Sequence, residues 1–109
     1  MNRRALSRTN VEYGTCLMVK NGLYIGAIKN ISFGGLFIES NIEVKLMDRI
    51  DMSIFLQSDS GDFEIDAVAV ATRVDKGGIA LKYDHLDPNE LQILKTYINN
   101  LGASSQSTH

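Results

Sequence analysis

The sequence predicts an all-β fold: about six antiparallel strands closed into a small barrel, followed by one C-terminal helix. Three observations lead to this prediction. Short segments of alternating polar and apolar residues follow one another at hairpin spacing, and turn residues separate them. No helical pattern interrupts these segments, and the one clear helical periodicity comes after them. With 109 residues, the chain has room for one domain with a single core.

The first three strands are expected at residues 11–19, 23–31 and 36–39. Polar and apolar residues alternate along 11–19, and Asn21-Gly22 then forms a strong hairpin signal because both residues adopt positive φ at low cost. Residues 32–35 are predicted to be the next turn. Cys16 is the only cysteine, so no intramolecular disulfide can form, and we expect it to be a half-buried strand residue.

The last three strands are expected at residues 49–57, at residues 62–74, and around Ile79, Leu81 and Tyr83. In the first of these, one face carries Ile50, Met52, Ile54 and Leu56. Along 62–74 the apolar phase changes, from Phe63 and Ile65 to Val68 and Val70. This change predicts a bulge or bend near Ala67, of the kind that small closed barrels need.

The helix is expected to begin after Asp87, which is a good N-cap, with Pro88 at the first helical position and Glu90 completing a capping box. Its apolar stripe consists of Leu91, Leu94, Ile98 and Leu101. Gly102 is expected to end it. The predicted organisation is a flexible basic arm at residues 1–10, the barrel with its helix at 11–102, and a disordered tail at 103–109.

Charge and composition argue against several functions. The net charge is −2, and the basic side chains concentrate in the first thirty residues, which leaves the body acidic. General DNA or RNA binding, which needs a broad basic surface, is therefore not expected.

No apolar run is long enough to cross a membrane, and no secretory signal is visible, so a cytoplasmic location is expected. His85 lacks the companions that a metal site needs, and no catalytic constellation is present, so we expect neither a metal nor an enzyme.

Two polar clusters carry the functional prediction. Arg4 and Arg8 form an RxxxR segment, with Arg3 directly before it, and Asn30, Ser32 and Gly35 form an NxSxxG turn about twenty residues later. The two motifs occur in this order and at this spacing on a chain with the predicted strands and terminal helix. In these features the chain resembles the PilZ family over about residues 3–101. The family implies a six-stranded antiparallel PilZ-like β-barrel.

The resemblance implies a bacterial receptor for cyclic di-GMP with no other cofactor. It places the ligand on Arg4, Arg8, Asn30, Ser32 and Gly35, and it links a basic residue at the position of Arg3 to binding of a stacked ligand dimer. The chemistry is suitable, because the arginine fork pairs with phosphate oxygens and with guanine O6 and N7. Gly35 is expected to adopt positive φ and let the backbone approach the ligand. A domain of this kind signals to a partner protein that controls motility, pili or exopolysaccharide.

Two alternatives remain open at this stage. A PilZ-fold protein-interaction adaptor would not bind nucleotide, and its arginines and turn would be an ordinary tail and an ordinary bend. A barrel that binds single-stranded nucleic acid would need aromatic platforms on a basic face, and the chain has no Trp. For Arg73, at the end of a strand, we expect a surface ion pair and not a ligand contact.

Overall fold

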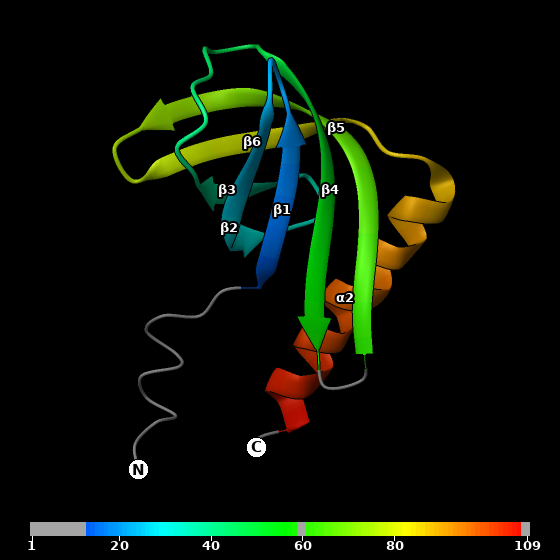
Figure 1. The fold of residues 1–109 in the computed structure, drawn as a ribbon. Helices are drawn as coiled ribbons and strands as arrows, with labels where there is room; N and C mark the ends of the chain where they lie inside the picture. Colours follow the sequence, from blue (N-terminus) through cyan, green and yellow to red (C-terminus); the bar gives the residue numbers. More distant parts are fainter. Residues whose placement is uncertain (1–12, 59–60, 108–109) are drawn as a thin grey trace.

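The computed structural model describes residues 13–58 and 61–107, which form a closed antiparallel barrel and one helix (Figure 1). The strands are β1 (Gly14–Val19), β2 (Leu23–Ile31), β3 (Gly35–Glu39), β4 (Arg49–Ser58), β5 (Gly61–Asp75) and β6 (Gly78–His85), and the helix α2 spans Pro88–Ser107. Around the barrel their order is β1-β2-β3-β6-β5-β4. The predicted fold class is confirmed, and the closure places β3 beside β6, far from it in sequence.

The core lies inside the barrel, where alternate residues of each strand point inward. The face of β4 that carries Ile50, Met52, Ile54 and Leu56 is buried, as predicted. Cys16 is fully buried and not half-buried, because the inward phase of β1 belongs to Cys16 and Met18. The alternate residues of β1, Leu17 and Val19, therefore lie on the outer face.

The predicted change of apolar phase along β5 is wrong. The buried positions keep one phase throughout, at Ile65, Ala67, Ala69 and Ala71, while Val68 and Val70 are only partly buried. Small side chains suffice there because the interior of a six-stranded barrel is narrow. The predicted irregularity does exist, since the pairing of β5 with β6 shifts register between Val68 and Ala69 and again between Ala71 and Arg73.

Helix α2 lies beside β5 (Figure 1) and buries Leu94 and Tyr97 in the core. The Tyr97 ring meets Phe63 edge-on, with centroids 5.5 Å apart. The Tyr97 hydroxyl lies 3.5 Å from the carbonyl oxygen of Tyr13, just before β1. The helix therefore joins the two ends of the described chain through one aromatic residue.

The ends of α2 differ from the sequence prediction. Glu90 forms no capping box, because its carboxylate accepts a hydrogen bond from the Asp66 backbone at 2.6 Å, and the Asp87 carboxylate pairs with His85 at 2.9 Å. The helix continues past Gly102 to Ser107. Extending an existing helix needs no new nucleus, so one glycine, at a cost of about 1 kcal/mol, does not have to stop it.

Candidate ligand-binding site

The NxSxxG residues form the tight turn that joins β2 to β3. The Ser32 backbone N–H donates to the Gly35 carbonyl at 2.8 Å and closes the turn around Phe33 and Gly34. The Ser32 hydroxyl donates to the same carbonyl and accepts from the Gly34 N–H, both at 3.3 Å. Much of the role of Ser32 is therefore to stabilise its own turn, as serine commonly does.

Strand β6 holds this turn from the side. The Tyr83 N–H donates to the Gly34 carbonyl at 3.0 Å, and Gly35 is the register partner of Lys82. A Cβ atom at Gly35 would lie 2.0 Å from the Leu81 carbonyl oxygen. The predicted positive φ at Gly35 is wrong, since its φ is outside the left-handed region. Glycine is required at this position because the β6 backbone approaches too closely for any side chain.

A shallow pocket of about 280 Å³ opens beside the turn. Asn30, Ser32 and Gly35 line it together with Phe37 of β3 and Lys82 of β6. The Asn30 side chain is exposed, and among the described residues its amide has no hydrogen-bond partner. Of the described residues in the lining, only Lys82 is charged. The pocket thus offers an unpaired amide and one cation, which suits a polar, anionic ligand.

Phe37 and Lys82 are residues that the sequence analysis did not assign to the site. Alternation along the strand places Phe37 on the same face as Gly35, so this signal was present in the sequence. Nothing in the sequence states that β3 pairs with β6, and only that pairing brings Lys82 to the turn.

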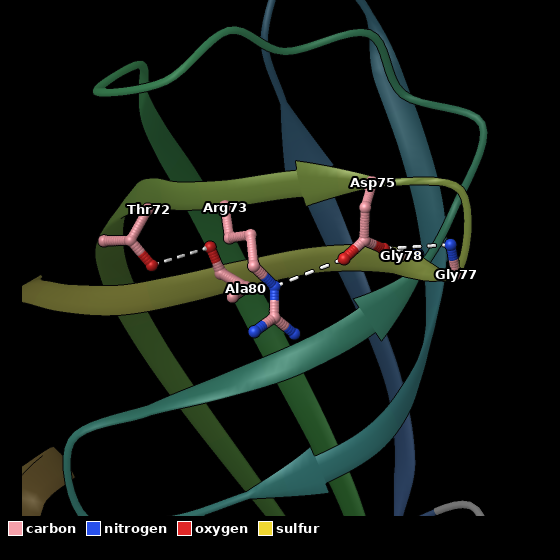
Figure 2. Close-up of polar contacts among 6 residues, drawn as sticks. All are labelled: Thr72, Arg73, Asp75, Gly77, Gly78 and Ala80. Atoms are coloured by element: carbon pink, nitrogen blue, oxygen red, sulfur yellow. Dashed lines mark hydrogen bonds and ion pairs between the residues drawn. The ribbon is translucent and has the colours of Figure 1, made fainter.

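Arg73 lies on the same outer face, in one register row that runs Asn30, Phe37, Ala80, Arg73 across four strands. Its guanidinium lies 5.4 Å from the centroid of the Phe37 ring. Figure 2 shows the Arg73 side chain paired through Nε with Asp75, at 3.2 Å. The other Asp75 oxygen accepts the N–H groups of Gly77 and Gly78 at 2.9 and 3.1 Å. The expected surface ion pair is confirmed, and it is fixed by the β5–β6 turn.

Three of the six predicted ligand residues, Asn30, Ser32 and Gly35, therefore meet at one pocket. The other three, Arg3, Arg4 and Arg8, lie outside the described residues. Within residues 13–58 and 61–107, no group of three or more His, Cys, Asp or Glu side chains is placed to hold a metal ion. No helix in this part of the chain is long and apolar enough to span a membrane.

The barrel, the terminal helix and the polar turn together define the class of protein. It is a small β-barrel domain with a surface pocket at its β2–β3 turn. The chain belongs to the PilZ domain family, whose sequence profile matches residues 2–100. PilZ domains are typically receptors or adaptors without enzymatic activity, and the family is linked to cyclic di-GMP.

One solved structure illustrates the shared fold. The inhibitor of motility MotI (DgrA) of Bacillus subtilis superposes with a TM-score of 0.73 at 16% sequence identity, over 84% of this chain. The match covers 47% of the MotI chain, so the present chain spans about half the length of that protein. No curated protein matches the sequence significantly.

Proposed function

We propose that this protein is a receptor for cyclic di-GMP that passes the signal to a partner protein and catalyses no reaction. The observation that carries the proposal is that Asn30 and Lys82 line one pocket at a PilZ turn, where the Asn30 amide has no partner among residues 13–58 and 61–107. An amide offers both a donor and an acceptor to a guanine edge, and Lys82 offers a cation to a phosphate. A bacterial cytoplasm is the compartment that this ligand implies.

The pocket by itself is small for such a ligand. Its volume of about 280 Å³ lies just below the range of about 300–1,000 Å³ common for sites that enclose a small molecule. A dinucleotide would therefore rest on the turn, and a second element would have to cover it. We assign that role to Arg4 and Arg8, with help from Arg3, because guanidinium groups bind phosphates bidentately and pair with or stack on guanine.

The energetics of this arrangement set how many contacts the arm has to make. Ordering a free chain segment costs roughly 1–2 kcal/mol per residue in backbone entropy. Charge-assisted hydrogen bonds return roughly 1.5–3 kcal/mol each, so a few of them offset several ordered residues. The arm, once ordered against the barrel, would present a new surface to the partner protein.

Isothermal titration calorimetry with cyclic di-GMP tests the proposal. We expect micromolar or tighter binding by the unaltered chain, and none detectable in an Arg4→Ala, Arg8→Ala double variant. Lys95→Ala removes an exposed cation from α2, far in sequence from the turn, and should bind as the unaltered chain does. Unchanged affinity in the double variant would overturn the assignment of the arm.

A second function has one observation in its favour. The Ser32 hydroxyl already bonds its own turn, as it would in a PilZ-fold adaptor that binds no nucleotide. If cyclic di-GMP is titrated into the unaltered chain and gives neither heat nor chemical-shift changes, that result would support this alternative.

A further inference from the structure

The outer face of the β1–β2 hairpin carries a continuous apolar strip that belongs to neither the core nor the pocket. Leu17 pairs with Ile25 and Val19 pairs with Leu23 in register, so the four side chains lie on one face. Three are well exposed: Val19 at 56%, Leu23 at 67% and Ile25 at 66%. Single exposed apolar residues are ordinary, but a contiguous group marks an interaction surface. We call these four residues the hairpin strip.

An acidic border adjoins the hairpin strip on β4 and β5. Val19 is the register partner of Asp51, and Leu17 is the partner of Ser53, which in turn pairs with Asp66. A depression of about 510 Å³ runs from the strip to Asp51, Asp66 and Asp87. His85 also lines it, but it is paired with Asp87 at 2.9 Å. One side of this surface is therefore apolar and the other is acidic.

The charges of the described chain indicate what can cover such a surface. A second copy supplies little complement, because most of the described cations of its barrel and turns already have acidic partners: Lys20 with Asp48, Lys29 with Glu39, Arg49 with Asp84 and Arg73 with Asp75. An anionic membrane or a nucleic acid would be repelled by the acidic border. A peptide segment with apolar and basic residues side by side complements both halves at once.

We propose that the hairpin strip and its acidic border dock an amphipathic, basic helix of a partner protein. Such a helix would place its apolar i, i+3, i+4 and i+7 side chains on the strip and its Lys or Arg side chains against Asp51 and Asp66. This proposal rests on the proposed function only in that an adaptor needs a partner. None of the described residues lines both the docking surface and the pocket at the β2–β3 turn.

The test uses a synthetic amphipathic helix of leucine and lysine, about 18 residues long so that it is helical, and a leucine–glutamate helix of the same pattern. Each is titrated into the isotope-labelled full chain and followed by nuclear magnetic resonance. We expect the lysine helix to bind at least about tenfold more tightly, with chemical-shift changes concentrated at Val19, Leu23, Ile25 and Asp51. Shift changes elsewhere, or equal binding of both helices, would overturn the proposal.

Matched variants separate this surface from general charge attraction. Asp51→Asn with Asp66→Asn removes two charges from the border, while Asp62→Asn with Glu64→Gln removes two from exposed positions of β5 outside it. The first pair should weaken binding of the lysine helix about tenfold, and the second should change it less than about twofold. Equal weakening by both pairs would contradict the proposal. Val19→Thr with Ile25→Thr keeps the β-branched shape and should weaken binding at least about fivefold.

Two further measurements complete the design. Sedimentation that shows self-association abolished by Val19→Thr with Ile25→Thr would make a second copy the occupant and overturn the proposal. An Asn30→Ala, Ser32→Ala variant should bind the lysine helix as the unaltered chain does. Failure of the unaltered chain to bind cyclic di-GMP, with helix binding intact, would remove the proposed function alone. Binding of cyclic di-GMP by the unaltered chain without binding of the lysine helix would remove the docking surface alone.

Discussion

Gly34 and Gly35 are neighbours in one turn, yet only Gly35 has to be glycine. A Cβ at Gly35 would lie 2.0 Å from the Leu81 carbonyl oxygen, whereas a Cβ at Gly34 would meet no atom within 4 Å. We expect Gly35→Ala to lower the free energy of unfolding by about 2 kcal/mol or more, because backbone has to shift. Gly34→Ala is the control and should stay within about 0.5 kcal/mol of the unaltered chain. Urea unfolding measures both, and equal effects would contradict the role given to β6.

Cys16 gives a second prediction at the residue scale. Burial raises the pKa of its thiol to about 11, against a smaller opposite effect of a backbone hydrogen bond with Gly26. The reactive species is the thiolate, so a raised pKa keeps the folded thiol protonated and inert up to about pH 10. Ellman's reagent at pH 8 should label the native chain at least about a hundredfold more slowly than the urea-unfolded chain. Rapid labelling of the native chain would show that β1 opens or that Cys16 is not in the core.

At the scale of the elements, alternation along each strand predicts the barrel well but predicts the inward face less well. Residues 49–57 have one apolar phase, and that phase is buried. Along β5 both phases are apolar, since alanines alternate with valines, and hydrophobicity alone favours the larger valines. The narrow interior selects Ala67, Ala69 and Ala71 instead, and that constraint appears only after closure.

In the candidate site too, a local sequence motif identifies some residues, and others come together only through strand pairing between distant parts of the chain. Asn30, Ser32 and Gly35 are within six residues of one another, so a local motif identifies them. Lys82 reaches the turn only through the pairing of β3 with β6, which no local pattern encodes. The contact of Glu90 with the Asp66 backbone is missed for the same reason, since it crosses from α2 to β5 and competes with the capping box.

The attachment of α2 to the barrel can be tested at Tyr97. This side chain is 1% exposed, packs edge-on against Phe63 and reaches the Tyr13 carbonyl. Tyr97→Ala should cost about 3–5 kcal/mol of unfolding free energy, because it removes a large buried ring. Thr96→Ala alters the exposed neighbour and should cost less than about 1 kcal/mol. Similar losses in the two variants, measured by urea unfolding, would show that α2 does not depend on this contact.

At the scale of the whole molecule, ligand binding and stability are linked. A ligand that binds only the folded chain raises the free energy of unfolding by about 2.7 kcal/mol at a concentration of one hundred times Kd. For a domain of this size, that corresponds to a rise in Tm of about 10 °C. We therefore expect cyclic di-GMP to raise Tm by this amount, and guanosine monophosphate, which lacks the second nucleotide, to raise it far less. The measurement is differential scanning calorimetry over a series of ligand concentrations.

The same experiment on Asn30→Ala with Ser32→Ala decides where the stabilisation originates. Asn30 has no partner among the described residues, so its loss leaves the barrel intact, while the loss of the Ser32 hydroxyl removes only bonds of 3.3 Å within an exposed turn. The variant should therefore melt within a few degrees of the unaltered chain when no nucleotide is present. With cyclic di-GMP, its Tm should rise by less than about 2 °C, because the turn no longer offers an amide to the guanine edge. A full rise in this variant would place the nucleotide somewhere other than the β2–β3 turn.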